Sequence, residues 1–460
     1  MSRFLSDRLS PAAPRNSPRI AGRRFVSGLL LLTFGVLTLA ATVPSPLCAV
    51  DPKTAQKIDE EIEKNRADII KIRRFIHMNP ELGNREFETA RQVSAKLDTL
   101  GLEVRNGVAK TGVVALLRGG QPGITVAVRA DMDALPIQET TGVPFRSLNA
   151  GVMHACGHDV HTSILLGAAT VLSSLKERIK GNVTFIFQPA EEGAPPGEEG
   201  GADLMVREGV LVNPPVSAIF ALHVWPEDVG HVLVAPGPVT ASSDEFRIIV
   251  KGRSAHGARP QEGVDAIVIA AEIVQALQTI VSRAVDPTDP AVVTVGTIQG
   301  GTRSNIIADK VVLEGTVRVL SDANRKKIPP LVDSIARGIC EMHDAACDVD
   351  YKPVVPSVYN NPELAATLTP TLVQLLGKDK VLEWKPQLIS EDFSFFAQKI
   401  PGFYFFLGAK NPSQPVAAPL HSPNFNPDER SIPLGIKILC HLVLDALDQQ
   451  SAASAGASRF

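Results

Sequence analysis

Apolar and polar positions recur at helical spacing in some parts of the chain and at strand spacing in others. Residues 53–78 and 86–100 carry apolar positions three and four apart, which predicts two amphipathic helices. Short β-rich runs follow, separated by further helical stretches. This alternation predicts a layered α/β part with a largely parallel sheet. The predicted strands are 113–117, 124–130, 183–188, 218–223 and 403–407, and the further helices are 163–175, 363–376 and 433–447.

The pattern changes at about residue 243. From there, strands 246–250, 291–298 and 311–319 alternate with helices 264–282 and 324–342 in a βαββαβ-like order. This order is typical of a small ferredoxin-like unit, with helices on an antiparallel sheet. We therefore expect a smaller α+β domain inserted in the first one. The expected divisions are a catalytic domain in two parts, residues 50–242 and 356–449, the inserted domain, residues 243–355, and a disordered tail, residues 450–460.

Residues 1–49 have the pattern of a targeting segment. Arg23 and Arg24 precede an apolar run over residues 25–43, and small residues and prolines follow as far as Ala49. This arrangement predicts an export signal that is cleaved after Ala49. Uncleaved, the run is just long enough to anchor the protein in a membrane. We expect an exported protein, either periplasmic or secreted.

Composition excludes some classes of function. The 460 residues include 46 basic and 49 acidic side chains, a net charge of −3, so no general attraction to nucleic acid is expected. The hydrophobic content of 44% is that of a soluble globular protein. The five cysteines are spread along the chain and are too few for a disulfide framework.

Candidate chemistry is concentrated in residues 153–161, Met-His-Ala-Cys-Gly-His-Asp-Val-His. Thiolate and imidazole are good ligands for divalent metal ions, so Cys156 and His158 form a candidate metal-binding pair. The helical pattern that follows places the pair at a helix N-terminus. Two ligands do not complete a site, so we expect others elsewhere in the chain. The alternative is a buried Cys with hydrogen-bonded His residues at a turn.

Three further candidate ligands lie at strand ends or in loops. Glu192 follows strand 183–188, His223 ends strand 218–223, and His421 lies between two prolines. Chemistry in parallel sheets gathers at the carboxyl ends of strands. Five ligands exceed the needs of one structural zinc ion and indicate two metal ions that share ligands, with positions open for water. Taken alone, His223 could equally be a packed strand-end residue.

Carboxylates next to these candidates suggest hydrolytic chemistry. Glu191 and Glu192 point in different directions, so one can bind metal while the other faces a water molecule as general base. The alternative is a solvated surface pair. Asp133 is a candidate to accept the second N–H of a ligand His, which would fix its tautomer. Otherwise Asp131 and Asp133 cap the following turn.

Six segments appear in the order Arg-Ala-Asp-Met-Asp-Ala-Leu-Pro (129–136), Met-His-Ala-Cys-Gly-His-Asp (153–159), Gln-Pro-Ala-Glu-Glu-Gly (188–193), Leu-His-Val-Trp-Pro (222–226), Ser-Ala-His-Gly-Ala (254–258) and Ser-Glu-Asp-Phe (390–393). Together they resemble the dinuclear metallopeptidase family that includes aminoacylase and glutamate carboxypeptidase. Within it, the sequence is most similar to the amidohydrolase branch of hippurate hydrolases and indole-acetyl-amino-acid hydrolases. The resemblance covers residues from about 61 to 447.

The resemblance implies a role for each candidate. Asp133 orients a ligand His and Glu191 is the general base. His256 and Asn305 match positions that bind the substrate carbonyl or stabilise the oxyanion. The inserted domain acts as a lid, and in a homodimer formed through it His256 can act across the interface. Two divalent ions, drawn from Mn, Zn, Co and Ni, are held by Cys156, His158, Glu192, His223 and His421, with Cys156 bridging.

We therefore predict a metal-dependent amidohydrolase. It cleaves small N-acyl amino acids, of the hippurate or acetyl-amino-acid kind, to a carboxylic acid and a free amino acid. A metal-activated water attacks the amide, with Glu191 as general base. One alternative is a dipeptidase or carboxypeptidase on the same scaffold. The other is a non-catalytic exported protein that binds metal or ligand, although Glu191 would serve no purpose there.

Overall fold

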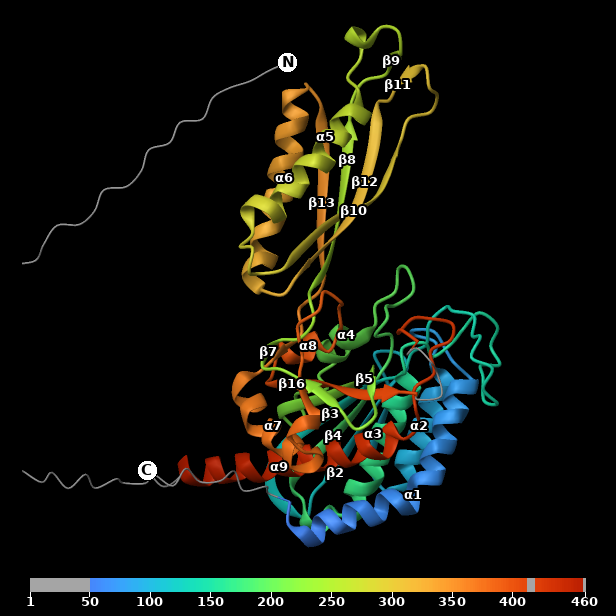
Figure 1. The fold of residues 1–460 in the computed structure, drawn as a ribbon, viewed down its shortest axis with the longest axis vertical. Helices are drawn as coiled ribbons and strands as arrows, with labels where there is room; N and C mark the ends of the chain where they lie inside the picture. The colour runs from blue at the N-terminus through green and yellow to red at the C-terminus, as the bar shows by residue number, and fades with distance from the viewer. Residues whose placement is uncertain (1–49, 412–417, 458–460) are drawn as a thin grey trace, which may run out of the picture. The chain divides into compact units, whose positions relative to one another are not determined.

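The computed structural model describes residues 50–411 and 418–457; the predicted export segment, residues 1–49, lies outside them. Its larger sheet has eight strands in the order β1-β2-β4-β3-β5-β16-β6-β15 (Figure 1). The four central strands β4, β3, β5 and β16 are mutually parallel, which confirms the predicted α/β class. The bounds are β1 (Glu103–Val108), β2 (Gly112–Arg118), β3 (Gln121–Asp131), β4 (Lys180–Gln188), β5 (Val216–Asp228), β6 (Val232–Val234), β15 (Val381–Glu383) and β16 (Gly402–Lys410).

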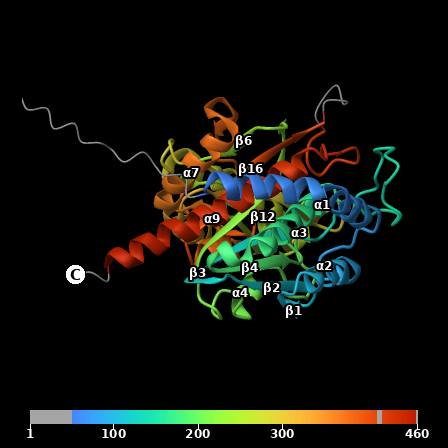
Figure 2. The same ribbon diagram turned by 90° about the horizontal axis from the view of Figure 1, so that it is seen from below.

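Helices cover both faces of this sheet. Figure 2 shows α1, α3 and α9 side by side on one face, where their apolar residues join one core with those of the strands. Short helices contribute apolar residues to a second core on the opposite face. The bounds are α1 (Pro52–Met78), α2 (Phe87–Thr99), α3 (His158–Ser174), α4 (Gly201–Arg207), α7 (Pro362–Leu376), α8 (Ser394–Ala397) and α9 (Ser431–Ala457).

Helix α3 begins at the predicted Cys-His cluster. Its N-cap residue Gly157 has φ +95°, and a Cβ there would lie 2.4 Å from Cγ2 of Val224. Glycine is therefore required at this turn, both for its backbone angle and for the close approach of β5. Residues from His158 to Leu172 are all buried, because α3 lies between the sheet, α1 and α9. This explains the apolar, Ala-rich run in the sequence.

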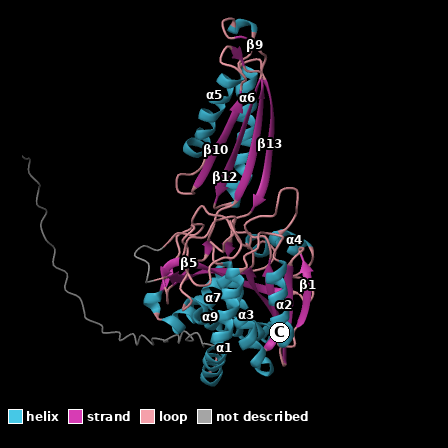
Figure 3. Ribbon diagram, turned by 90° about the vertical axis from the view of Figure 1, so that its right-hand side faces the viewer, coloured by secondary structure: helices cyan, strands magenta, loops and turns pink. Residues whose placement is uncertain are grey.

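Between β7 (Gly237–Pro238) and β14 (Tyr359–Asn360) the chain forms a second, antiparallel sheet in the order β10-β12-β8-β13. Helices α5 and α6 cover one face of it and share a separate apolar core with the strands (Figure 3). The order β8-α5-β10-β12-α6-β13 is the expected ferredoxin-like α+β unit. We call it the inserted unit. The bounds are β8 (Ser243–Lys251), α5 (Ala266–Thr279), β10 (Ala291–Gly300), β12 (Lys310–Val319), α6 (Asp322–Met342) and β13 (Ala346–Val355), and the pair β9 (Ala255–His256) and β11 (Ile306–Ile307) forms a small hairpin-like sheet.

Within the described residues, Ala266–Ala284 is long and apolar enough to cross a membrane by length and composition. In the structure this stretch contains α5, whose side chains Ile269, Ile273 and Leu277 are buried in the core of the inserted unit. About a third of the stretch (33%) is buried inside the protein.

Two expectations differ from the structure. Helix α9 continues to Ala457 where a disordered tail was expected from residue 450, because the Ala-rich extension has high helix propensity; residues 458–460 lie outside the described residues. His223 lies inside β5 and not at its end, because β5 continues to Asp228 beside β16.

An ion pair joins helices α1 and α9. Asp59 of α1 lies 2.7 Å from Lys437 of α9, next to the buried His441.

Candidate metal centre and active site

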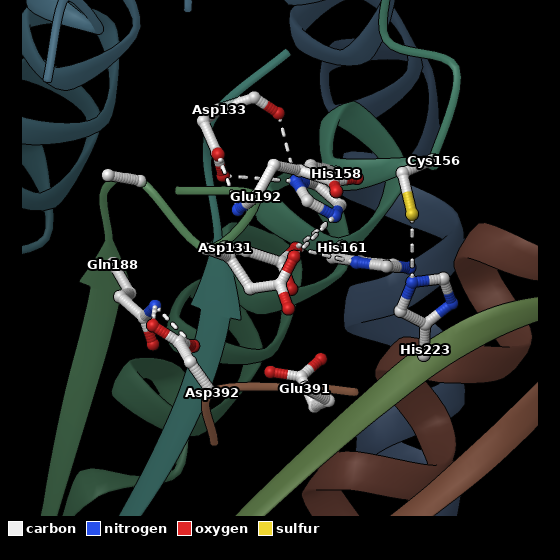
Figure 4. A network of polar contacts seen from close by, with 12 residues as sticks. Asp131, Asp133, Cys156, His158, His161, Gln188, Glu192, His223, Glu391 and Asp392 are labelled. Atoms are coloured by element: carbon white, nitrogen blue, oxygen red, sulfur yellow. Dashed lines mark hydrogen bonds and ion pairs between the residues drawn. The ribbon is translucent and has the colours of Figure 1, made fainter. Parts of the chain in front are cut away.

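The five predicted metal ligands come from four separate parts of the chain and converge. Cys156 Sγ lies 3.2 Å from His223 Nε2 and 3.3 Å from His421 Nε2. His421 Nε2 is also 3.0 Å from a carboxylate oxygen of Glu192. Figure 4 shows Cys156 and His158 at the start of α3, with His223 approaching from β5.

The donor atoms form two groups that share one sulfur. One group is Cys156, His158 and His223, and the other is Cys156, Glu192 and His421; within each group the ligand atoms lie within 4.8 Å of one another. This geometry supports a pair of ions with Cys156 between them. The assignment of each residue as a ligand stays a prediction.

Main-chain carbonyls fix the tautomers of two of the histidines. His158 Nδ1–H donates to the carbonyl oxygen of Asp133 at 2.9 Å, with the Asp133 carboxylate 3.2 Å away. His223 Nδ1–H donates to the carbonyl oxygen of Val224 at 2.6 Å. Each Nε2 is therefore left with a lone pair that points into the site, as a ligand requires. Asp133 thus orients His158 as expected, but its main-chain oxygen is the nearer acceptor.

His421 is placed by its backbone. It adopts φ +60°, and its N–H donates to the carbonyl oxygen of Ala155 at 2.9 Å. This bond joins the loop before α9 to the turn that carries Cys156. The side chain of His421 is 51% exposed, whereas His158 is fully buried, so the centre opens to solvent on the His421 side.

The electrostatics of the protein alone fit a cation at this place. Burial opposes a charge on His158, but Asp131 and Asp133 outweigh it and raise its pKa to about 10. His158 Nε2 is buried without a hydrogen-bond partner. Burial raises the pKa of the Cys156 thiol, and Glu192 and Glu191 add to this effect. A divalent ion would replace the protons on both groups and neutralise the surrounding carboxylates. The residues therefore fit the predicted ions.

Glu191 contacts the site at His158, whereas Glu192 contacts it at His421. Its carboxylate lies 3.8 Å from His158 Nε2, and its side chain is 10% exposed. Burial raises the pKa of Glu191, and the neighbouring carboxylates of Glu391 and Glu192 raise it further. Carboxylate oxygens of Glu191 and Glu192 lie within 4.8 Å of each other and of a ring nitrogen of His158. The division of the pair into a general base and a ligand therefore stays a prediction.

A buried arginine, not predicted from the sequence, holds several of these acids in place. Arg129 donates to Asp131 at 2.7 Å, to Glu391 at 2.9 Å and to Asp392 at 3.0 Å. Asp131 also accepts a hydrogen bond from His161 Nδ1–H at 2.7 Å (Figure 4). Arg129 and its partners lie in segments 129–136 and 390–393, which carry the family resemblance. The sequence signal for their network was a basic residue within an apolar strand.

A second buried network joins α1 to both sides of the centre. Arg73 Nε lies 2.8 Å from the carboxylate of Asp159, and Arg73 also reaches Glu429 at 3.4 Å. His77 Nδ1–H donates to Asp159 at 2.8 Å, and its Nε2 lies 3.4 Å from Glu139. Burial opposes a charge on His77, but Asp159 outweighs it and raises the pKa of the imidazole. We call Arg73 and His77 the α1 clamp. No role for these two residues was predicted from the sequence.

A cavity of about 360 Å³ opens over the candidate centre. Four of the five predicted ligands line its polar end together with Glu191, and its other walls are largely apolar; the four are Cys156, Glu192, His223 and His421. The apolar and aromatic wall residues are Trp225, Pro226, Ile389, Tyr404, Phe406, Pro419 and Leu420. Such a pocket suits a small organic substrate with an uncharged portion.

The other two predicted site residues lie elsewhere. His256 and Asn305 are exposed and close to each other in the β9–β11 region, where the N–H of Gly257 donates to the carbonyl oxygen of Asn305 at 2.8 Å. His256 follows β8 in the chain, and Asn305 lies beside it. The nine residues of β8 span roughly 30 Å at about 3.3 Å per residue. The chain therefore does not bring His256 and Asn305 to its own pocket.

Comparison with known proteins defines the class. The family model described as peptidase family M20/M25/M40 matches residues 127–445. The chain therefore belongs to this family. Its fold and donor set are those of a metal-dependent enzyme acting on amide bonds.

Proteins similar to this chain are named for several different activities. The chain is 41% identical to thermostable carboxypeptidase 2 of Saccharolobus solfataricus, over 85% of this chain and 97% of the relative. It is 38% identical to IAA-amino acid hydrolase ILR1-like 5 of Arabidopsis thaliana, over 84% and 88%. It is 36% identical to N-acetylcysteine deacetylase of Bacillus subtilis, over 83% and 97%.

A solved structure supports the same fold. The YXEP protein of Bacillus subtilis, described as a dinuclear metal binding peptidase from the M20 family, superposes with a TM-score of 0.73 and 34% identity. The match covers 84% of this chain and 99% of that one. The match includes the inserted α+β unit as well as the larger sheet, so the predicted fold class is confirmed.

Proposed function

We propose that the protein hydrolyses N-acyl amino acids to a carboxylic acid and a free amino acid. The observation that carries this proposal is the shared Cys156 sulfur between two donor groups, with the buried carboxylate of Glu191 in the same cavity. Relatives named as an IAA-amino acid hydrolase and an N-acetylcysteine deacetylase act on this class of amide. The apolar wall around Trp225 and Phe406 accommodates the acyl group or an apolar amino-acid side chain.

Each residue then has a task in the reaction. Two divalent ions held by the five ligands would polarise the amide carbonyl and lower the pKa of a water molecule. Glu191 takes a proton from that water and later delivers it to the leaving amine. A raised pKa makes the carboxylate of Glu191 a stronger base toward that water. Asp133 keeps the Nε2 of His158 free for its ion.

The proposal includes a homodimer that forms through the inserted unit. His256 is a candidate to stabilise the oxyanion, yet it lies far from the pocket of its own chain. A second copy can supply it. Apolar side chains are exposed on the inserted unit, on α5 and on the edge strand β10, and an unpaired edge strand favours association. They are Ile267, Val268, Val292 and Ile298. In this arrangement the inserted unit acts as a lid.

A carboxypeptidase or dipeptidase activity is the second candidate, favoured by the relatives named thermostable carboxypeptidase. Such an enzyme would cleave a peptide bond with the same groups. The two differ in the substrate's N-terminal side, which is an acyl group in one and an amino acid in the other. Export is proposed as well, from the pattern of residues 1–49 alone.

The test uses the chain from residue 50 onward, stripped of metal and reloaded with manganese, zinc, cobalt or nickel. Hippurate, N-acetyl amino acids and free dipeptides with the same C-terminal residues are compared. Release of the amino acid from the N-acyl substrates and not from the dipeptides supports the proposal. Faster cleavage of the dipeptides would favour the second candidate, and no turnover with any metal would contradict both.

A further inference from the structure

Buried carboxylates hold the main chain on both sides of Glu191. The residue before it, Ala190, has φ +52°, which residues other than glycine rarely adopt. The N–H of Ala190 donates to Glu86 Oε1 at 2.8 Å. The N–H of Glu192 donates to Asp133 Oδ2 at 2.9 Å. Asp133 belongs to the site already described, whereas Glu86 comes from a segment with no assigned role.

Glu86 is itself well fixed. Its side chain is fully buried, and its second oxygen accepts a hydrogen bond from Thr111 Oγ1–H at 2.6 Å. The segment before it packs tightly on the same turn, since a Cβ on Gly83 would lie 2.6 Å from the carbonyl oxygen of Gly193. Glu86 therefore cannot move away from Ala190 without disturbing its hydrogen bond to Thr111 and the packing of Gly83 against Gly193.

The conformation of Ala190 decides where the next side chain points. A left-handed residue reverses the local chain direction, and in an L-residue it costs free energy because Cβ crowds the carbonyl oxygen. A hydrogen bond from the Ala190 N–H to the fixed oxygen of Glu86 can offset this cost. Without that bond, Ala190 would relax toward ordinary backbone angles and turn Glu191 away from the cavity.

We infer that Glu86 is a positioning residue for the general base: its hydrogen bond to the N–H of Ala190 holds the left-handed turn that directs Glu191 into the cavity. The inference rests on the proposed function of Glu191. It predicts that loss of the Glu86 carboxylate lowers turnover, while the ions and the substrate still bind.

The experiment compares Glu86→Ala with Glu81→Ala. Glu81 lies in the same segment, but its carboxylate accepts the N–H groups of Glu88 and Thr89 at 3.0 and 2.9 Å and does not touch the turn. We expect Glu86→Ala to lower kcat by roughly 10- to 100-fold, with KM and the content of two ions unchanged. Glu81→Ala should keep wild-type kcat even if its melting temperature falls.

A second substitution tests the backbone directly. Glycine adopts positive φ without the steric cost, so Ala190→Gly in the Glu86→Ala background should recover part of the lost kcat. Glu86→Gln keeps an oxygen for the N–H of Ala190 and should lie close to wild type. Equal kcat in Glu86→Ala and the wild type, or no recovery in the double variant, would overturn the inference.

Two further variants allow the inference to be tested if Glu86→Ala does not fold, and separate it from the proposed role of Glu191. If Glu86→Ala does not fold, Thr111→Val is measured, because it removes the hydroxyl that orients Glu86; a lower kcat with both ions bound supports the inference, and an unchanged kcat overturns it. Glu191→Gln is measured in parallel. If Glu191→Gln remains active, the proposed role of Glu191 fails. If it is inactive while Glu86→Ala is not impaired, only the positioning inference is wrong.

Discussion

Exchanging each of the two adjacent glutamates for glutamine separates their roles. Glu191→Gln removes a base whose carboxylate lies 3.8 Å from His158 Nε2. Glu192→Gln removes a charged oxygen that lies 3.0 Å from His421 Nε2. The two substitutions have the same chemistry and are one residue apart in the chain. Any difference between them therefore reports the direction of each side chain.

The expected sizes follow from these positions. Loss of general-base catalysis lowers turnover by about 10²- to 10⁴-fold, or roughly 2.7–5.4 kcal/mol of barrier. Glu191→Gln should show this loss and still bind about two ions per chain, as the five ligands predict. Glu192→Gln should lose ion content first, because it leaves His421 and Cys156 as the only remaining donors of their group.

Stability without metal gives an independent measure. Burial and the carboxylates of Glu391 and Glu192 raise the pKa of Glu191, so the folded protein binds a proton there more tightly than the unfolded chain. This contribution is present below the ordinary glutamate value of about 4.5 and is lost as the pH rises through the folded-state pKa. Glutamine carries no charge, so metal-free Glu191→Gln should melt higher than the wild type at pH 8 and show a smaller difference at pH 4.5.

The assay combines steady-state kinetics, metal analysis after gel filtration and thermal melts of metal-free protein at both pH values. Wild-type turnover by Glu191→Gln would refute its role as general base. Equal loss of metal from both variants would refute the division between base and ligand. A lower melting temperature of metal-free Glu191→Gln at pH 8 would contradict the electrostatic reasoning.

Three other substitutions test separate parts of the structure. Cys156→Ser should make activity depend on added metal, because a hydroxyl stays protonated and ligates poorly; full activity and metal content without supplementation would reduce Cys156 to a packing role. His256→Ala should lower kcat by about 10²- to 10³-fold with little change in KM or metal content, and mixing it with Glu191→Gln chains, with subunit exchange verified, should restore part of the activity if His256 acts in a dimer. His441 is buried, and burial together with the nearby Lys437 lowers its pKa to about 4, so its stabilising contribution is complete above about 6.5 and is lost as the pH falls toward 4. The variant His441→Leu should therefore lose about 2–3 kcal/mol less stability than the wild type between pH 7 and pH 4, measured by urea unfolding.

The convergence of the candidate ligands could be predicted because several of them have a local signal. Cys156 and His158 are two residues apart before a helix, and Glu192 follows an apolar strand. Parallel strands bring their carboxyl ends to one edge of a sheet, so residues far apart in sequence could be expected to meet. His223 shows the limit of this reasoning, since β5 continues past it.

The residues that support the site could not be predicted in the same way. Glu86 and Ala190 are 104 positions apart, and Arg129 and Glu391 are 262 apart. Periodicity along the chain describes which face of an element is buried, but it does not specify which partner a buried charge will find. The location of His256 depends on the direction in which β8 leads the chain away from the larger sheet. The sequence pattern does not specify that direction.

The α1 clamp ties the order of assembly to the centre. Arg73 contacts Asp159 beside one ligand group and Glu429 just after the loop of the other, so the first described helix holds segments that are synthesised 270 positions apart. His421 and Glu429 are made only after the whole inserted unit. A nascent chain presents Cys156, His158, Glu192 and His223 before His421 exists. Both ligand groups can therefore be complete only in a chain in which α1, the turn that carries Cys156 and the loop that carries His421 have come together.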